Sequence, residues 1–547
     1  MNVPSAPPLY ALISDADDAF VAQLTDGQRA QLHAALTYHA LLNPGSPITV
    51  TIAIGDPSQM PALTGPSSLS GTAVEGLHPH HEVRARSTAL GSQGAAEVRR
   101  AVRLGHPQAS PATTRPPVQQ SLPRRVYRAL EQRGPVVLDT VREFIMRRRE
   151  REISSPLPPF PHGQHDADIS AAFDHWARVP APAPAGPAAV LFGLHWLQTG
   201  GAERWAIESI QIAKDAGFLP VIVTDQNSVH PWLARPELQD CVVITLSFED
   251  HEHPIDVAFA HALLENFNFS GVVLHHSYFL YQMLPWIKQH RPYLPVIDSL
   301  HIVEYLGGGY PGLAVRFDEF IDMHHVISPQ LVEWLTDVQS VERDKLTLAP
   351  LTALTVDKID GFARRDGAAP ITIAFVGRLS RQKRPDVFLG LVKELRRRKL
   401  RFRAILHGDG EMREIVDGLL ARFGLIDDIE QRFEDTPVAD TLAESDVLLI
   451  TSINEGLTLT TFEAVAAGIP VISTDVGSQR TIVQGEALLP RPARQFIGGA
   501  AALIERLAGS EELRERLWAN QFEQVTDFSA LPTAHHFMKE LFASWQA

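Results

Sequence analysis

The sequence predicts an α/β protein with two doubly wound, Rossmann-like domains in tandem and a separate N-terminal region. From about residue 188 onward, short apolar runs typical of buried parallel strands alternate with helical stretches. This alternation restarts at Ile371. Composition and charge also change near residue 187, which indicates that two different kinds of chain segment are joined there.

The first 187 residues differ from the rest in charge and in proline content. They hold 17 basic residues against 16 acids and 23 of the 40 prolines, whereas the remaining 360 residues hold 32 basic residues against 48 acids. We expect residues 1–120 to form an accessory region with a helix over Asp17–Leu42 and a strand over Ile48–Ile54. The stretch from Pro57 to Pro117 is rich in Gly, Pro, Ser and His and lacks clear periodicity, so part of this region is expected to be loosely ordered.

Residues 121–187 are expected to form a basic helix and a proline-rich linker, VPAPAPAGP at Val179–Pro187. The stretch 124–152 is strongly helical, holds nine arginines against five acids, and carries four apolar residues on one face: Val137, Val141, Phe144 and Ile145. One interpretation is a solvated helix packed on its neighbour. The other is a basic amphipathic segment, residues 121–153, that rests on an anionic membrane surface.

The two α/β domains are expected over residues 188–352 and 353–525. In the first, the apolar run Ala189–Leu197 is followed by a Gly-Gly turn and a helix, and further strand candidates follow at intervals of roughly 20–30 residues. The second begins with the strand candidate Ile371–Leu379, and a helical piece within 526–547 ends the chain. Domains of this class bind ligands at the carboxyl ends of their strands, so a cleft between the two is the expected site.

Cysteine content, hydropathy and charge exclude several classes of protein. Cys241 is the only cysteine, so we expect neither an intrachain disulfide nor a cysteine-based zinc cluster, and a reducing compartment is the natural home. No run of eighteen apolar residues occurs, and the first twenty residues lack a basic leader, which predicts neither a membrane span nor a secretion signal. The formal charge of −15 argues against generic nucleic-acid binding. The expected location is therefore cytoplasmic.

Two cations follow the first strand of the second domain. The strand 371–376 continues into Gly377 and Arg378, Lys383 comes five residues later, and a helix begins at Pro385. A tight turn, two cations and a helix N-terminus together form a plausible anion site, in which Arg378 offers a bidentate fork and Lys383 a mobile point charge. The alternative is a solvated basic loop.

Two glutamates lie eight positions apart after a later strand. Glu455 lies on a loop and Glu463 about two turns into a helix whose other residues, over 458–467, are small and apolar. A carboxylate in so apolar a helix is costly unless it accepts hydrogen bonds, and the hydroxyls of a sugar or a ribose are suitable donors. The alternative is that Glu463 simply pairs with a neighbouring arginine.

The segments FVGRLSRQKRPD and SDVLLITSINEGLTLTTFEAVAAGIPVISTDVGS resemble the retaining nucleotide-sugar glycosyltransferases of family 4, which have a GT-B fold. The resemblance runs from residue 188 to the end of the chain. It implies that Arg378 and Lys383 bind the donor diphosphate and that Glu463 holds the donor ribose. It also implies that Glu455 contacts hydroxyls of the transferred sugar, helped by the backbone N–H groups of Gly456 and Leu457.

The first α/β domain carries matching features. HWLQTGGAER is similar to the family's Gly-rich loop under the diphosphate, where Gly200 and Gly201 would let the backbone approach closely and the following helix would direct its N-terminus at negative charge. His301 follows a strand, where the family often has a histidine near the donor sugar. The last helix would cross back to the first domain, as in other GT-B chains.

Two features depart from the family pattern. The usual Asn-Gly near the hinge is replaced by the sequence Pro-Leu-Thr-Ala at 350–353, and the turn at 432–434 lacks the glycine often found there, which leaves recognition of the nucleobase open.

Metal-binding patterns are weak. The adjacent histidine pairs at 275–276 and 324–325 lie at strand ends, where neighbours point to opposite faces, and three further histidines (78, 80 and 81) lie in the Gly- and Pro-rich stretch. The Asp-x-Asp matches at 15–17 and 166–168 fall outside the α/β domains. We therefore predict that no metal and no cofactor is required.

The sequence thus predicts a retaining, metal-independent hexosyltransferase that moves a sugar from a UDP- or GDP-sugar to an acceptor hydroxyl. The acceptor is expected to be a glycan or a lipid-linked molecule in the synthesis of glycans, glycolipids or cell-surface polysaccharides, reached in the cytoplasm or peripherally at the inner face of a membrane. Two alternatives are a non-catalytic GT-B binding module and a GT-B nucleotide-sugar epimerase. The sequence leaves the oligomeric state open.

Overall fold

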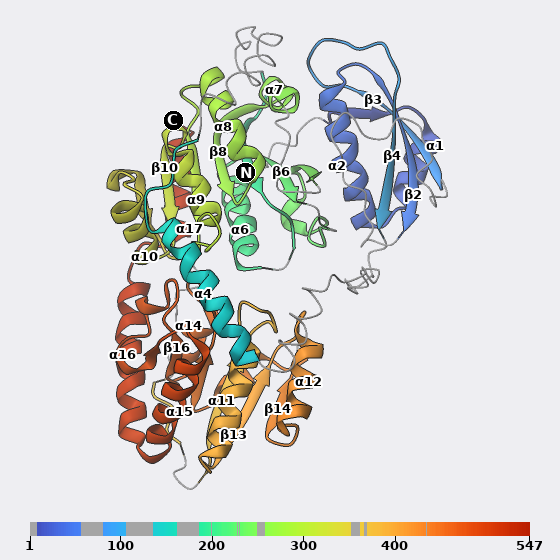
Figure 1. The fold of residues 1–547 in the computed structure, drawn as a ribbon. Coiled ribbons are helices and arrows are strands. Elements are labelled where there is room, and N and C mark those ends of the chain that lie inside the picture. The colour runs from blue at the N-terminus through green and yellow to red at the C-terminus, as the bar shows by residue number, and fades with distance from the viewer. Residues whose placement is uncertain are drawn as a thin grey trace.

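A computed structural model of the 547-residue chain describes residues 8–55, 80–105, 135–160, 185–198, 200–226, 228, 230–248, 257–351, 361–365, 369–433 and 435–546. They form a small N-terminal domain, two larger α/β lobes and a long helix that lies across both lobes (Figure 1). Among the helices within these ranges, none is both long enough and apolar enough to cross a bilayer.

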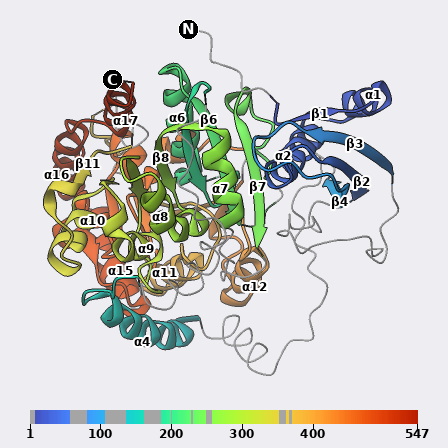
Figure 2. The same ribbon diagram turned by 90° about the horizontal axis from the view of Figure 1, so that it is seen from above.

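The N-terminal domain is a four-stranded sheet with two helices. Its strands are β1 (Tyr10–Leu12), β2 (Pro47–Gly55), β3 (His81–Ser87) and β4 (Val98–Gly105), in the order β1-β3-β2-β4, and its helices are α1 (Asp15–Gln23) and α2 (Asp26–Leu42). The domain has its own apolar core. Tyr38 and Leu41 of α2 belong instead to the core of the first lobe, so α2 joins the domain to the side of that lobe near β7 (Val242–Phe248), as Figure 2 shows.

Two expectations for this domain are wrong in detail. The helix predicted over Asp17–Leu42 is two helices, because Thr25 and Gln28 form a capping box that starts α2. The strands β3 and β4 lie in the stretch where we recognised no periodicity, although β3 alternates buried and exposed residues. Much of that stretch lies outside the described residues.

Lobe 1 contains a seven-stranded parallel sheet in the order β11-β10-β9-β8-β5-β6-β7. Besides β7, the strands are β5 (Ala188–Leu194), β6 (Leu219–Gln226), β8 (Asn268–His275), β9 (Val296–Leu300), β10 (Met323–Val326) and β11 (Leu346–Leu348). Its helices are α6 (Gly201–Asp215), α7 (Val257–Asn266), α8 (Tyr278–His290), α9 (Gly309–Arg316) and α10 (Pro329–Glu333). The first strand lies inside the sheet and the order reverses beside it, which is the arrangement of a doubly wound fold.

Lobe 2 repeats this design with six parallel strands in the order β14-β13-β12-β15-β16-β17. The strands are β12 (Ile371–Val376), β13 (Phe402–His407), β14 (Ile429–Arg432), β15 (Val447–Ile450), β16 (Val471–Thr474) and β17 (Leu488–Leu489). Its helices are α11 (Pro385–Arg397), α12 (Arg413–Phe423), α13 (Val438–Ala443), α14 (Leu459–Ala466), α15 (Ala493–Gly509) and α16 (Glu511–Ser529). The predicted fold class, two doubly wound domains with a separate N-terminal region, is confirmed.

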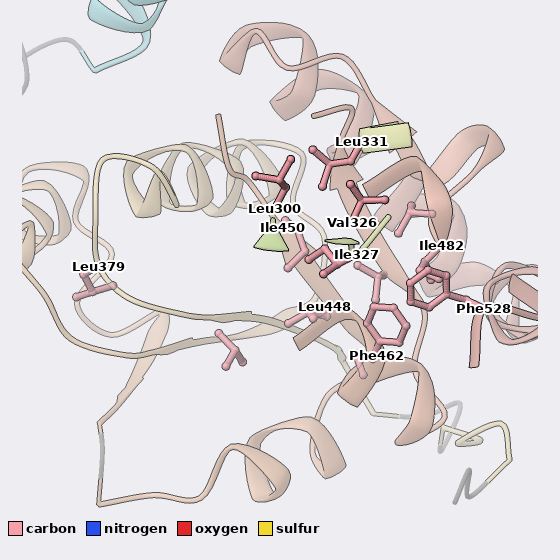
Figure 3. Packing of buried hydrophobic residues seen from close by; sticks show 14 of the residues in the cluster. Leu300, Val326, Ile327, Leu331, Leu379, Leu448, Ile450, Phe462, Ile482 and Phe528 are labelled. Atoms are coloured by element: carbon pink, nitrogen blue, oxygen red, sulfur yellow. The ribbon is translucent and has the colours of Figure 1, made fainter. Parts of the chain in front are cut away.

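The two lobes share one continuous apolar cluster. Figure 3 shows part of this cluster, in which Leu300 at the end of β9 lies near Ile450 at the end of β15. After α16 the chain returns to lobe 1, where α17 (Ala534–Ser544) packs on α6 and buries Met538 and Phe542. The strand ends of both lobes are therefore held close together.

The helix α4 (Pro135–Ile153) lies against α11 and α15 of lobe 2 and reaches lobe 1 at its end (Figure 1). Leu138, Met146 and Ile153 are buried, whereas Val141, Phe144 and Ile145 are 51, 74 and 46 % exposed. The expected apolar face is therefore not the face that packs on the protein. Residues 124–134 of the predicted helix lie outside the described residues.

Candidate functional site

Lys383 and Glu455, two of the predicted site residues, are in direct contact. Lys383 Nζ lies 2.6 Å from Glu455 Oε1, and Glu455 also accepts a 2.5 Å hydrogen bond from Ser452 Oγ. The lysine side chain is 27 % exposed and the glutamate side chain only 7 %. A partly exposed ammonium group thus neutralises a buried carboxylate at the end of β15, and this cation can also reach an anion that enters from solvent.

Arg378, the other predicted cation, follows β12 in a turn that glycines make possible. Gly377, Gly408 and Gly410 have φ of 154°, 142° and 153°, and a Cβ on Gly408 would overlap the Gly377 carbonyl oxygen. The sequence from 407 to 410 forms a tight turn after β13. Arg378 is exposed, and no ion pair joins it to a carboxylate of the described residues.

The loop that carries Glu455 meets lobe 1 backbone to backbone. A Cβ on Gly456 would lie 2.7 Å from the carbonyl oxygen of His301, and a Cβ on Gly477 would overlap the carbonyl oxygen of Glu455. Only residues without a side chain fit at these two positions. The predicted residues His301, Glu455 and Gly456 are thereby brought together from two different lobes, and half-buried Leu457 follows them.

Polar contacts fix the two lobes in this arrangement. Tyr305 Oη donates to the Ile453 carbonyl at 2.6 Å, and Asn454 Nδ2 donates to the Val303 carbonyl at 3.0 Å. A cavity of about 380 Å³ opens beside these contacts and is lined by Glu455 and by other residues of both lobes, among them Ile302, Gln330, Trp334, Ser478 and Arg480. Its volume falls within the usual range for small-molecule sites.

Glu463 lies at the exposed surface of α14, with no ion pair to an arginine of the described residues. Partial burial raises the pKa of its carboxyl group, and the charge of Arg204 in lobe 1 opposes this shift. Within the described residues, the alternative that Glu463 pairs with a neighbouring arginine is therefore supported by the charge of Arg204 alone and by no ion pair.

Gly200 and Gly201 begin α6, as expected, but their surroundings differ from the prediction. A Cβ on Gly200 would overlap the carboxylate of Glu203, whereas a Cβ on Gly201 would meet nothing within 4 Å. Close approach of the backbone therefore explains only Gly200. Glu203 is buried in the first turn of α6, so this helix N-terminus already has a carboxylate beside it.

Glu203 is itself held by two aromatic neighbours. Trp196 Nε1 donates to Glu203 Oε1 at 2.5 Å, and His195 Nε2 lies 3.1 Å from the same atom. Burial raises the pKa of the Glu203 carboxyl, but these two partners outweigh it and leave the pKa below its usual value.

His301 lies in a cluster of buried and half-buried rings that sequence analysis did not find. The His276 ring stacks on Tyr310 with centroids 4.5 Å apart and lies 5.0 Å from the His301 ring and 5.4 Å from the His195 ring. Burial lowers the pKa of His276 and of His301 well below the usual value, so both are neutral hydrogen-bonding groups. Each of these histidines directly follows a strand of one sheet, which is the signal that could have grouped them.

Asp225 adds a carboxyl group at the same edge of the lobe 1 sheet. Its Oδ2 atom accepts hydrogen bonds from Ser277 Oγ at 2.9 Å and from the Phe279 N–H at 2.8 Å. Burial raises the pKa of this carboxyl to about 7, and the two hydrogen bonds oppose that shift only in part. The carboxyl group can therefore exchange a proton near neutral pH.

No group of three His, Cys, Asp or Glu side chains within the described ranges has the geometry to hold a metal ion. Asp17 of the first Asp-x-Asp match accepts a hydrogen bond from the Arg84 N–H, which is a structural contact. The second match, at 166–168, and His78 lie outside those ranges.

A further group missed by sequence analysis stands next to Lys383. Arg384 is 1 % exposed, has a left-handed backbone with φ of 52°, and pairs with Asp139 of α4 at 2.9 Å. The two residues are 245 positions apart, and no local pattern links them.

Comparison with known proteins identifies relatives of this chain. The family model described as glycosyl transferases group 1 matches residues 370–508. One component of the human phosphatidylinositol N-acetylglucosaminyltransferase is 32 % identical over 120 residues, which are 22 % of this chain and 24 % of that protein. The D-inositol 3-phosphate glycosyltransferase of Corynebacterium efficiens is 25 % identical over 312 residues, which are 51 % of this chain and 73 % of that protein.

Solved structures of similar shape include Anabaena HepE in complex with UDP. It is 15 % identical to this chain, with a TM-score of 0.49, and the match covers 65 % of this chain and 98 % of HepE.

Proposed function

We propose that this chain is a glycosyltransferase that transfers a sugar from a nucleotide-diphosphate sugar to an acceptor hydroxyl with retention of configuration. The match of residues 370–508 to the model of glycosyl transferases group 1 and the two doubly wound lobes support this proposal. The observation that carries this proposal is the contact between Lys383 and Glu455 at 2.6 Å, next to the backbone of His301. The contact supports the proposal because a cation that can bind a diphosphate and a carboxylate that can accept hydrogen bonds from sugar hydroxyls lie together between the two lobes.

In this proposal, the donor diphosphate binds the ammonium group of Lys383, in place of Glu455, and the exposed guanidinium group of Arg378. Glu455 is then released from the lysine and accepts hydrogen bonds from the sugar hydroxyls, beside the N–H groups of Gly456 and Leu457. Glu463, which is exposed and makes no ion pair with the described residues, holds the ribose. Gly200, Gly201 and the start of α6 lie on the opposite side of the donor, where Glu203 limits how much further negative charge the helix end attracts.

The chemistry follows from where charge develops. As the glycosidic bond breaks, negative charge builds on the departing phosphate, and Arg378 and Lys383 stabilise it more strongly in the transition state than in the bound donor. The residues supply no carboxylate that we assign as a covalent nucleophile. We therefore favour the route in which the acceptor attacks from the face that the phosphate leaves and the phosphate takes the acceptor proton. Neutral His301 is a hydrogen-bond partner for the sugar.

A UDP- or GDP-sugar is the proposed donor, and no metal ion or cofactor is assigned. The two cations perform the neutralisation of the diphosphate that a metal would otherwise supply. A glycan or a lipid-linked molecule, in the synthesis of glycolipids or cell-surface polysaccharides, is the proposed acceptor. The names of the human and corynebacterial relatives both refer to inositol, so inositol phosphates and phosphatidylinositol belong among the acceptors to be tested.

Peripheral contact with a membrane, through α4, is part of the proposal. The outer face of α4 carries the exposed side chains of Val141, Phe144 and Ile145, and exposed Arg148 and Arg149 follow them. Apolar side chains flanked by arginines match the surface of an anionic bilayer. A lipid-linked acceptor would be reached from that surface.

The experiment that tests the proposal begins with thermal shifts of the full chain in the presence of UDP-, GDP- and ADP-sugars. The donor that raises the melting temperature is then incubated with the enzyme and a panel of acceptors. We expect release of the free nucleoside diphosphate and a glycosylated acceptor with retained configuration. Binding without any release would indicate a non-catalytic module, and a changed sugar still attached to its nucleotide would indicate an epimerase.

A further inference from the structure

Arg384 binds the loop that carries Glu455. It is also the neighbour in sequence of Lys383, the lysine that contacts Glu455. Its guanidinium group donates to the carbonyl oxygens of Thr451 at 2.6 Å and Ser452 at 3.3 Å. These two residues lead from β15 to Glu455. In return, Thr451 Oγ1 donates to the carbonyl oxygens of Lys383 at 2.7 Å and of Arg384 at 3.0 Å. The segments of Lys383 and Glu455 are thus joined by four hydrogen bonds through one arginine and one threonine.

The backbone of Arg384 is unusual for such a residue. Its φ of 52° is in the left-handed region, which costs free energy for a residue with a Cβ and is rarely retained without a compensating contact. The side chain is 1 % exposed, so its charge is also taken out of water. Both costs fall on the residue next to Lys383, at the proposed diphosphate site.

The negative charge that balances Arg384 comes from α4, which lies outside the two lobes. Asp139 Oδ1 of α4 lies 2.9 Å from the Arg384 guanidinium, and Asp139 Oδ2 accepts the N–H of Ala493, the first residue of α15. Asp139 is 4 % exposed. Asp386 is also near Arg384, but burial raises the pKa of its carboxyl group, and it makes no ion pair with Arg384. Asp139 is therefore the carboxylate that pairs directly with this buried arginine, and Asp386 adds a charge nearby.

A second arginine connects α4 to the same loop through lobe 1. Arg491 binds Glu143 of α4 with two hydrogen bonds of 2.8 Å and Glu150 with hydrogen bonds of 2.5 and 3.1 Å. Arg491 Nη1 also donates to Tyr305 Oη at 2.7 Å, and Tyr305 in turn donates to the Ile453 carbonyl. Ile453 is two positions before Glu455.

The end of α4 is bound to lobe 1 directly. The carbonyl oxygen of Ile153 accepts hydrogen bonds from Trp334 Nε1 at 3.0 Å and from Gln339 Nε2 at 3.2 Å. One helix therefore contacts lobe 2 through Asp139, both lobes through the Arg491 network, and lobe 1 through Ile153.

We propose that Asp139 and Arg384 are positioning residues of the transfer reaction, which makes α4 a structural part of the donor site although it lies outside the matched region 370–508. The pair fixes the Thr451–Glu455 segment against Lys383, so that the cation and the hydroxyl acceptor meet the donor in one geometry. Neither residue is assigned a contact with substrate. This inference rests on the proposed function for its effect on turnover, but not for its effect on the structure of the loop.

A purely structural role makes a different prediction. Removing one member of a buried ion pair is strongly destabilising, whereas replacing both members with apolar residues is often neutral for stability. If the pair serves only stability, the double replacement restores the melting temperature, the slow local exchange and the turnover. If the pair positions the loop, the double replacement restores the melting temperature alone, because the hydrogen bonds from Arg384 to Thr451 and Ser452 are still missing.

The test uses the full chain with Asp139→Asn, with the double replacement Asp139→Leu/Arg384→Met, and with Glu152→Gln, which removes the charge of an exposed acid of α4, as the matched control. Four quantities are measured: the melting temperature, hydrogen–deuterium exchange of peptides that cover residues 447–458, the Kd of UDP, GDP and inorganic pyrophosphate, and the turnover of the donor. Misplacement by about 1 Å can cost on the order of 100-fold in rate.

We expect Asp139→Asn to speed exchange in 447–458 more than in the lobe 1 sheet, to weaken pyrophosphate binding, and to lower turnover by roughly 10–100-fold. The double variant should regain the melting temperature but keep the fast local exchange and the low turnover. The inference is overturned if Asp139→Asn leaves local exchange unchanged, or if the double variant recovers exchange and turnover together. A wild-type chain that binds neither UDP, GDP nor pyrophosphate while the exchange result holds would refute the proposed donor, not the positioning of the loop.

Discussion

The ammonium group of Lys383 lies 2.6 Å from Oε1 of Glu455, so the proposed diphosphate cation and the proposed sugar-binding carboxylate neutralise one another when no ligand is bound. When the donor binds, the contact between Lys383 and Glu455 must be replaced by one contact from each residue to the donor. The lysine turns to phosphate oxygens, and the carboxylate turns to sugar hydroxyls. The free enzyme thereby avoids leaving a carboxylate that is only 7 % exposed without a partner.

Replacing Glu455 with glutamine should separate binding of the diphosphate from transfer of the sugar. The amide keeps the shape but no longer competes for Lys383, so a free nucleoside diphosphate should bind as tightly as before or more tightly. Turnover should fall by on the order of 10²–10³, because the hydroxyl contact in the transition state is weakened. Titration calorimetry with UDP or GDP and a turnover assay give the two numbers. Loss of diphosphate affinity together with unchanged turnover would contradict the exchange of partners.

Gly456→Ala should disturb the junction of the lobes without disturbing either core. The new Cβ would lie 2.7 Å from the His301 carbonyl, so the Glu455 loop must move away from lobe 1. We expect turnover to fall by at least about tenfold, since the donor groups on the two lobes lose their common geometry. Gly418→Ala is the control, because a Cβ there meets nothing within 4 Å. Equal turnover of the two variants would show that the close approach has no role in the reaction.

The pKa of Asp225, raised to about 7 by burial, predicts a pH-dependent stability. In the unfolded chain this carboxyl titrates near its ordinary value of 3.8, so the folded state binds the proton more tightly. Stability is therefore greatest below that value and falls as pH rises toward 7, by roughly 4 kcal/mol for this group alone.

Asp225→Asn cannot ionise, and its carbonyl oxygen can still accept the hydrogen bonds from Ser277 and Phe279. The gain in melting temperature relative to wild type should therefore be small at pH 4 and large at pH 8. Thermal denaturation at the two pH values is the measurement. A gain that is the same at both would mean that the carboxyl of Asp225 is not held in its neutral form.

The outer face of α4 should bind anionic vesicles. Phe144→Ser with Ile145→Ser removes apolar contact, and Arg148→Glu with Arg149→Glu reverses charge, so each pair should reduce co-sedimentation with vesicles that contain phosphatidylglycerol. The effect of the arginine pair should shrink as salt rises, since salt screens exposed charges. Turnover on a water-soluble acceptor should stay at the wild-type level. Wild-type chain that stays in the supernatant with these vesicles at low salt would rule out this surface.

The fold could be predicted from sequence because it depends on local patterns. The resemblance to family 4 implied that Lys383 and Glu455 act at one donor site. Buried parallel strands give apolar runs, and the turns after β12 and β15 carry their functional residues within a few positions of the strand end. Gly456 directly follows Glu455, so its place is fixed by the loop itself.

What could not be predicted depends on contacts between distant segments. Asp139 meets Arg384 across 245 positions, and Glu143 meets Arg491 across 348. Acids that look like ordinary members of a basic helix are directed inward by these partners, which leaves Val141 and Phe144 outside. A helical pattern shows which residues share a face of the helix. The residues that the helix contacts elsewhere in the chain decide which face is buried.

The most direct test of diphosphate binding between the lobes is calorimetric titration of UDP and GDP into the wild-type chain, Lys383→Ala and Arg378→Ala. We predict that the wild type binds at least one of the two nucleotides and that each variant loses at least about tenfold in affinity, while all three chains melt within a few degrees of one another. Undiminished affinity in both variants would place the diphosphate elsewhere and would remove the basis for the transfer chemistry assigned to this cleft.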